Sequence, residues 1–120
     1  MRAAIVSNDS VVQERIADYL DKVGFAISAA HSVSDSESAL GALTPDDLLV
    51  LDCVDIPQAA SIEQAAKQAG CRSVGLIADQ QACQMEEFLA AGLDDLLVRP
   101  VAEDQLLLKL NSLGFNLSDA

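Results

Sequence analysis

Five short apolar runs divide the chain at fairly regular intervals. They are AAIV (3–6), FAISAA (25–30), LLVL (48–51), SVGLIA (73–78) and LLV (96–98). Continuous apolar runs of this length are typical of strands that are buried on both faces. The hydrophobic pattern therefore predicts five interior strands.

The segment after the first run has the periodicity of an amphipathic helix. Ser10 and Gln13 have the spacing of a capping box, and Gly24 suits the left-handed residue just past a helix end. The predicted helix therefore begins near Ser10 and ends before Gly24. Its apolar positions fall on one face, and they are Val12, Ile16, Tyr19, Leu20 and Val23.

Four further segments are predicted to be helices, over 34–43, 61–70, 80–92 and 102–114. Ser61 and Gln64 form a second capping box at the start of one of them. Asp79 is expected to cap the helix over 80–92, with Phe88 and Leu89 among its inward-facing residues. Strands and helices thus alternate along the whole chain.

This alternation predicts one α/β domain, a doubly wound five-stranded parallel sheet with five helices. The expected domain covers residues 1–113, and residues 114–120 form a C-terminal tail that could begin a linker. In such folds the ligand crevice lies at the carboxyl ends of the strands. Functional side chains are therefore expected directly after each strand.

Composition narrows the classes of partner. The 120 residues carry 19 acidic and seven basic side chains, a formal charge of −12. This charge repels nucleic-acid backbones and anionic membranes, so direct nucleic-acid binding is not expected. No apolar run reaches the length of a membrane span, and three cysteines without CxxC spacing suggest reduced thiols. We expect a cytoplasmic chain.

Polar or small residues follow four of the five predicted strands, and parallel strands bring these residues to one edge of the sheet. They are Ser7, Asn8 and Asp9 after the first strand, Asp52 after the third, Ala78 at the end of the fourth and Arg99 after the fifth. This edge is the candidate site.

Three segments resemble the receiver domain of two-component response regulators, a family with flavodoxin-like topology. They are IVSNDSVVQERIADYL after the first strand begins, PDDLLVLD at the third strand, and AAGLDDLLVRPV at the fifth. The last is the most specific, because glycine, two acids, an apolar pair and a basic residue before proline recur in order. The resemblance covers the chain to about residue 113.

The resemblance implies a set of site positions. In that family an acid pair holds Mg²⁺ beside a phosphoacceptor aspartate, a hydroxyl and a lysine contact the phosphoryl group, and an aromatic residue acts as the switch. The matching positions here are Ser7 and Asn8 for the acids, Asp52 for the phosphoacceptor, Ala78 for the hydroxyl, Leu96 for the aromatic and Arg99 for the lysine. Of these, Asp52 alone retains the residue of the family.

A weak Mg²⁺ site could still be built from Asn8, Asp9 and Asp52, because Mg²⁺ prefers oxygen ligands. The competing interpretation is that Asp9 caps the first helix, which would leave one carboxylate and an amide. Arg99 could contact a phosphoryl group, or it could pair bidentately with Asp52 and close the site without a metal.

Three hypotheses follow for function. The first is a degenerate receiver, not an enzyme, that acts as a protein-protein interaction module without Mg²⁺-dependent phosphoryl switching. The second is an atypical receiver that is phosphorylated weakly at Asp52, from a phosphodonor or a histidine kinase. The third, a small flavodoxin-like ligand-binding domain, is disfavoured because no glycine-rich phosphate loop follows the first strand.

The resemblance also implies a partner surface, formed by the fourth helix, the fifth strand and the fifth helix. A histidine kinase or an output domain are the expected kinds of partner, and homodimerisation through the same surface is the alternative. The outer face of the fourth helix carries glutamine and glutamate side chains, which suit a polar or basic partner.

Overall fold

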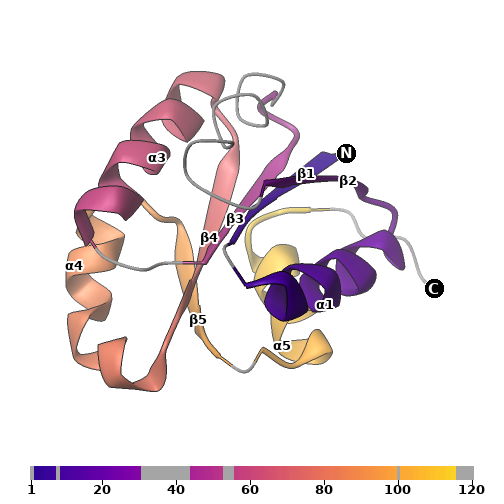
Figure 1. Cartoon of the computed structure of the whole chain (residues 1–120). Helices are drawn as coiled ribbons and strands as arrows, with labels where there is room; N and C mark the ends of the chain where they lie inside the picture. The colour runs from indigo at the N-terminus through magenta and orange to yellow at the C-terminus, as the bar shows by residue number, and fades with distance from the viewer. Residues whose placement is uncertain (1, 8, 31–43, 53–55, 100, 116–120) are drawn as a thin grey trace.

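The computed structural model describes residues 2–7, 9–30, 44–52, 56–99 and 101–115 of the chain. Five parallel strands form one sheet in the order β2-β1-β3-β4-β5 (Figure 1). Their bounds are Arg2–Val6 for β1, Ala26–Ala30 for β2, Leu48–Asp52 for β3, Arg72–Ile77 for β4 and Asp95–Val98 for β5. The predicted α/β fold and its five strands are confirmed.

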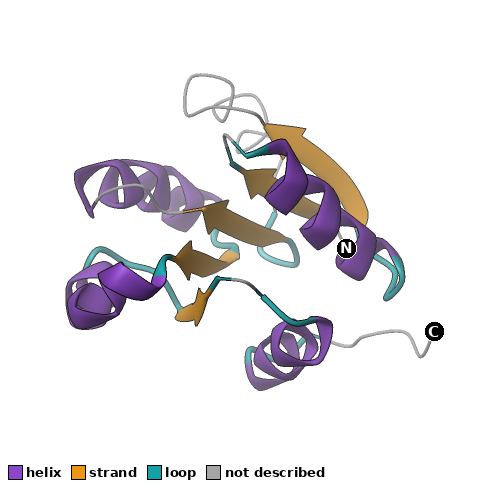
Figure 2. Ribbon diagram, turned by 60° about the horizontal axis from the view of Figure 1, so that its bottom comes forward, coloured by secondary structure: helices purple, strands orange, loops and turns teal. Residues whose placement is uncertain are grey.

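Helices cover both faces of the sheet. Figure 2 shows the sheet between two pairs of helices, α1 with α5 on one side and α3 with α4 on the other. The bounds are Ser10–Asp21 for α1, Ile56–Ala69 for α3, Met85–Ala90 for α4 and Glu103–Ser112 for α5, with a 3₁₀ helix, η1, over Asp79–Gln84. The helix predicted over 34–43 lies outside the described residues.

The core lies in two layers because successive strand residues point to opposite faces. In β1, Ala4 and Val6 pack with α3 and α4, whereas Ala3 and Ile5 pack with α1 and α5. All four side chains are almost completely buried. Burial on both faces explains why the strands read as continuous apolar runs.

The start of α1 differs from the predicted capping box. Asp9, not Ser10, is the N-cap, and its Oδ1 accepts hydrogen bonds from the amides of Val11 and Val12 at 2.9 and 3.4 Å. Gln13 does not complete a box with Ser10, because its side chain is buried and Nε2 donates to the Ile5 carbonyl at 3.4 Å. The prediction that Asp9 caps the helix is confirmed.

Helix α3 begins at Ile56, five residues before the predicted box at Ser61 and Gln64. Pro57 is the second helical residue, a position where the missing amide hydrogen costs no helical hydrogen bond. The predicted end is correct, because Gly70 follows the helix with a φ of 78°.

The segment predicted as one helix over 80–92 contains a 3₁₀ helix and then a short α-helix. A 3₁₀ helix has three residues per turn, so the inward face does not follow one helical period. Phe88 is fully buried as predicted, but Leu89 is 43% exposed. The prediction that Leu89 faces inward is wrong.

The C-terminal helix is amphipathic as predicted, with Leu106 and Leu110 buried. The core also includes Phe115, whose ring lies 5.5 Å from that of Phe25 and under the guanidinium of Arg72. Core packing thus reaches two residues past the predicted boundary at 113. No described helix combines the length and the apolar character that a membrane crossing requires.

Candidate functional site

Three polar side chains meet at the carboxyl edge of the sheet. Ser7 follows β1, Asp52 ends β3, and Arg99 follows β5. Each lies two residues beyond a core residue that packs against α1 and α5, so all three belong to that face of the sheet. The register of the parallel strands therefore gathers residues that are far apart in the sequence.

Both carboxylate oxygens of Asp52 are in contact with these neighbours. The Ser7 hydroxyl donates a hydrogen bond to Oδ2 at 2.8 Å, and Arg99 Nη1 lies 3.0 Å from Oδ1. The Asp52 side chain is 8% exposed. The Arg99 contact is a single ion pair rather than the bidentate pair, because neither Oδ1 nor Arg99 Nε has an aligned hydrogen-bond partner among the described residues.

The surroundings of Asp52 shift its pKa upward from the ordinary value. Burial raises the pKa of the carboxyl, and the nearby charge of Asp9 adds to this effect. The Ser7 hydrogen bond and the Arg99 charge lower the pKa, but the net direction is upward. Ser7 and Arg99 therefore offset only part of the cost of burying the Asp52 charge.

Ser7 also fixes the loop that follows β1. Its Oγ accepts a hydrogen bond from the Asp9 amide at 3.0 Å while it donates to Asp52. The Asp9 carboxylate meanwhile caps α1. Ser7, at the first position where an acid was expected, thus forms a hydrogen bond with Asp52. Asp9, the nearest described acid in this loop, has its carboxylate bound to the amides of α1.

These contacts do not fit the donor set that Mg²⁺ requires. The ion needs several hard oxygen ligands in near-octahedral geometry. Asp52 is engaged by Ser7 and Arg99, and no group of three His, Cys, Asp or Glu side chains within the described ranges could hold a metal. Asn8, the third predicted ligand, lies outside those ranges.

The two predicted switch positions lie in different environments. Ala78 follows β4 and lines a cavity beside Arg99, but it has no hydroxyl to offer. Leu96 is buried among the residues that pack against α3 and α4, on the other face of the sheet. Neither residue contributes a polar side chain to the Asp52 site.

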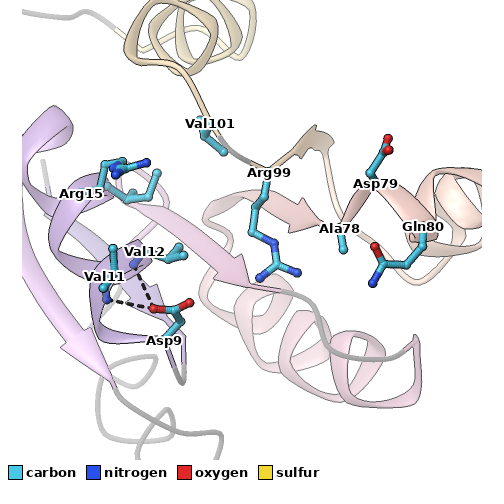
Figure 3. A pocket seen from close by; sticks show the side chains of 10 residues that line it. Asp9, Val11, Val12, Arg15, Ala78, Asp79, Gln80, Arg99 and Val101 are labelled. Carbon is cyan, nitrogen blue, oxygen red and sulfur yellow. Dashed lines mark hydrogen bonds between the residues drawn. The ribbon is translucent and has the colours of Figure 1, made fainter.

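The cavity beside Arg99 has a volume of about 400 Å³ and lies between α1 and the start of η1 (Figure 3). The sequence did not single out Arg15, which reaches this space from α1. Apolar and polar side chains line the cavity in equal number, namely Val11, Val12, Ile16, Ala78 and Val101 with Asp9, Arg15, Asp79, Gln80 and Arg99.

A second buried carboxylate, Glu63, was also missed. It is 1% exposed on α3, and its Oε1 accepts a short hydrogen bond from the Ser73 hydroxyl, while Oε2 has no partner among the described residues. Burial raises its pKa. The spacing of Ala59, Ile62 and Ala66 around Glu63 is the signal that could have placed it on the apolar face of α3.

Solved structures of receiver domains share this fold, although no family model and no curated protein sequence matches the chain. A response regulator from Clostridium difficile superposes with a TM-score of 0.80 at 17% identity, over 93% of each chain. The fold is that of a receiver domain.

Two other neighbours were solved with a bound molecule. The receiver domain of the Saccharomyces cerevisiae response regulator Ssk1, crystallised with the phosphotransfer protein Ypd1, has a TM-score of 0.77 at 21% identity, over 95% of this chain and 88% of that one. The Rec1 domain of ShkA, in complex with c-di-GMP, has a TM-score of 0.68 at 26% identity, over 98% and 95%.

Proposed function

We propose that this chain is a receiver-like signalling domain that acts as a protein-protein interaction module without Mg²⁺-dependent phosphoryl switching. The observation that carries the proposal is the contact of both Asp52 carboxylate oxygens with its own neighbours, Ser7 and Arg99. The receiver fold of the solved neighbours supports the signalling part of the proposal.

The chemistry of phosphorylation explains why these contacts matter. A carboxylate nucleophile needs a free oxygen aimed at the phosphorus atom, and catalysis depends on neutralising the other phosphoryl oxygens. At Asp52 one oxygen accepts from Ser7 and the other faces Arg99. A phosphoryl group would have to displace one of these contacts. No group of described acids could hold a metal ion that would compensate for the lost contact.

The switch positions support the same proposal. A hydroxyl after β4 could follow the phosphoryl group by hydrogen bonding, but Ala78 lacks one. An aromatic side chain on β5 could alternate between buried and exposed positions, whereas Leu96 is a buried core residue. Even a phosphorylated Asp52 would therefore lack the side chains that transmit the change to the surface.

The proposed partner surface is formed by α4, β5 and α5. Leu89 and Leu108 are 43% and 67% exposed there, and Glu86 and Glu87 add exposed negative charge. A hollow of about 650 Å³ lies between β5 and α5 and includes Leu108 and Lys109 in its lining. Exposed leucines beside acidic side chains suit a protein partner with an apolar contact area and a basic rim.

A test of the proposal can use beryllofluoride, a tetrahedral mimic of a phosphoryl group, together with Mg²⁺. We expect the amide NMR signals of β5 and α5 to stay in place when both are added to the labelled domain. Saturable shifts at Leu96 and along α5 would contradict the proposal, because they would show a working switch. Asp52→Asn serves as the control that removes the acceptor.

The partner surface has its own test. Sedimentation velocity over a wide concentration range should give a monomer if the surface serves a different protein. Association that Leu108→Asp abolishes, but that an exposed substitution on α1 such as Glu14→Ala does not, would instead support the homodimer through α4, β5 and α5.

A further inference from the structure

A second set of polar side chains lies at the amino end of β4, on the opposite edge of the sheet from Asp52. Ser73, the second residue of β4, is completely buried. Its hydroxyl donates the short hydrogen bond to Glu63 Oε1 and lies 3.5 Å from Asp94 Oδ2. Asp94 is exposed, whereas Glu63 is 1% exposed. Ser73 therefore connects an acid at the surface to an acid in the core.

The backbone of the loop between α4 and β5 packs on the same side chains. The Asp94 amide donates to the Ser73 carbonyl at 3.2 Å and to Ser73 Oγ at 3.3 Å, and Asp94 Oδ2 accepts from the Ser73 amide at 2.8 Å. Gly92 lies so close to α3 that a Cβ atom there would be 3.2 Å from Glu63 Cγ and 2.9 Å from Lys67 Cε. A change in the contacts of Glu63 therefore acts directly on this loop.

The single proton of the Ser73 hydroxyl cannot be donated to both carboxylates at once. A serine hydroxyl has one proton to donate and two lone pairs that accept. When Glu63 is ionised, Ser73 donates to it. When Glu63 is protonated, its own O–H donates to Ser73 Oγ, and the Ser73 proton is free to turn toward Asp94. Both lone pairs are then used, because the Asp94 amide occupies the second one.

The surroundings of Glu63 favour proton uptake. Burial raises the pKa of its carboxyl, and the charge of Asp94 adds to this effect. The Ser73 hydrogen bond and the Lys67 charge lower the pKa, but the net direction is upward. Glu63 Oε2 has no hydrogen-bond partner among the described residues, which costs more for a carboxylate than for a neutral acid.

The other titratable groups around this cluster keep one charge state near neutral pH. Burial raises the pKa of the Cys71 thiol to about 11, so Cys71 stays neutral. Hydrogen bonds from backbone amides outweigh burial at Asp47 and lower its pKa, so Asp47 stays ionised. On α4, which packs against α3, Glu86 and Glu87 are exposed. Glu63 is therefore the group in this cluster whose charge is set by its burial.

We propose that Asp94, Ser73 and Glu63 form a proton relay that makes the loop between α4 and β5 respond to pH. A proton from solvent enters on Asp94 Oδ2 and passes to Ser73 Oγ, while Ser73 gives its own proton to Glu63 Oε1. Only O–H bonds form and break, and the net result is one proton on Glu63 with both hydrogen bonds reversed.

The reversal should move the loop, because Ser73 Oγ and Asp94 Oδ2 are 3.5 Å apart. A good hydrogen bond between a hydroxyl and an oxygen acceptor is shorter, at about 2.7–2.8 Å. Proton uptake by Glu63 should therefore draw Asp94 toward β4. The relay lies apart from Asp52 and does not rest on the interaction function proposed above.

The test is an NMR titration of the full chain from pH 4 to 9. Carbon-13 signals of the side-chain carboxyls report protonation of Glu63 and Asp94, and amide signals report the loop. We expect the Glu63 carboxyl to titrate with a midpoint above its ordinary value of 4.5, and the amides of Gly92 and Asp94 to show a transition with the same midpoint. A Glu63 midpoint at or below 4.5, no titration of Glu63 in this range, or loop amides that follow only the Asp94 carboxyl would overturn the proposal.

Two variants that each remove one negative charge give a matched comparison. Glu63→Gln should abolish the transition in the Gly92 and Asp94 amides that has the Glu63 midpoint. Glu87→Gln removes the same charge from an exposed position on α4 and should leave this transition unchanged. Identical loop profiles in Glu63→Gln and the unaltered protein, or loss of the transition in both variants, would contradict the relay.

Ser73→Ala separates the relay from a simple effect of charge. Glu63 should still titrate, with a midpoint about one pH unit higher because its ionised form loses a donor, but the loop amides should no longer follow it. A loop transition that persists without the hydroxyl would overturn the proposal. Because Ser73 is buried, Asp94→Asn at an exposed position is the second variant. It should lower the Glu63 midpoint, and an unchanged midpoint would contradict the coupling of the two acids.

Discussion

Asp52 and Glu63 are both buried carboxylates that accept a hydrogen bond from a serine hydroxyl, yet they lie in very different places. Asp52 ends a strand at the carboxyl edge of the sheet, where Arg99 contacts it and a cavity lies nearby. Glu63 lies on α3 under Ser73, near the start of β4, and one of its oxygens has no described partner. Burial raises the pKa of both.

The difference shows that burial and a raised pKa do not by themselves mark a functional acid. Perturbed acids cluster at active sites, but structural acids are perturbed as well. Position decides between them, because the carboxyl edge of a parallel sheet is where ligands can approach. Glu63 is 1% exposed on α3 and accepts a hydrogen bond from Ser73 of β4, so we expect its protonation to affect stability.

The largest expected difference between the two acids concerns their basic neighbours. Arg99→Met should lower the free energy of unfolding at pH 7 by about 2–4 kcal/mol, because it leaves a buried carboxylate without its cation. Lys67→Met, beside Glu63, should have little effect because Lys67 is exposed. Urea unfolding followed by circular dichroism measures both.

A control separates lost charge from lost packing. Asp52→Asn in the Arg99→Met background should recover most of the stability, because it removes the unpaired charge. Equal losses in Arg99→Met and Lys67→Met, or no recovery in the double variant, would contradict the assignment of Asp52 and Arg99 as an ion pair.

Replacing each serine donor should give a smaller difference in the free energy of unfolding, and here the larger loss is expected at the Glu63 site. Ser73→Ala should cost about 2–3 kcal/mol, because Glu63 then has no described hydrogen-bond donor. Ser7→Ala should cost about 1–2 kcal/mol, since Asp52 keeps Arg99. The same urea measurement at pH 7 tests the order, and a larger loss in Ser7→Ala would reverse the comparison.

The pH dependence of stability gives the smallest effect. The pKa of Glu63 is raised in the folded protein above its ordinary value of 4.5. The unfolded chain therefore loses this proton first, and the Glu63 contribution to stability falls as pH rises from about 4.5 through the folded pKa. Glu63→Gln removes that contribution.

The variant should thus gain stability relative to the unaltered protein as pH rises, with a constant difference below about pH 4.5. Thermal unfolding of the unaltered protein and of Glu63→Gln across pH 4 to 8 measures this. A difference that does not change with pH would mean that Glu63 is ionised in the fold like an exposed glutamate.

The sequence predicted the sheet well because its strands are buried on both faces and therefore read as unbroken apolar runs. Helix starts were harder. Asp9 and Ser10 are both good caps, and only the backbone conformation selects Asp9. The sequence did not indicate the start of α3 at Ile56, because proline is more often a loop residue. Pro57 is nevertheless tolerated in the first helical turn.

The candidate site was predictable in position and less so in its contacts. Asp52 and Arg99 were placed at one edge because parallel strands end there together. The role of Ser7 as a donor to Asp52 depends on side-chain geometry that no spacing reveals. Arg15 reads as an ordinary exposed helical residue, and only the folded arrangement of the chain brings it and Arg99 to the lining of one cavity.

The central claim is that Asp52 is held by Ser7 and Arg99 and is not a working phosphoacceptor. The direct measurement is the intact mass of the protein after incubation with acetyl phosphate and Mg²⁺. The account predicts no phosphate-sized gain, in the unaltered protein or in Asp52→Asn. A stoichiometric gain that disappears in Asp52→Asn would contradict it and would favour the atypical but phosphorylatable receiver.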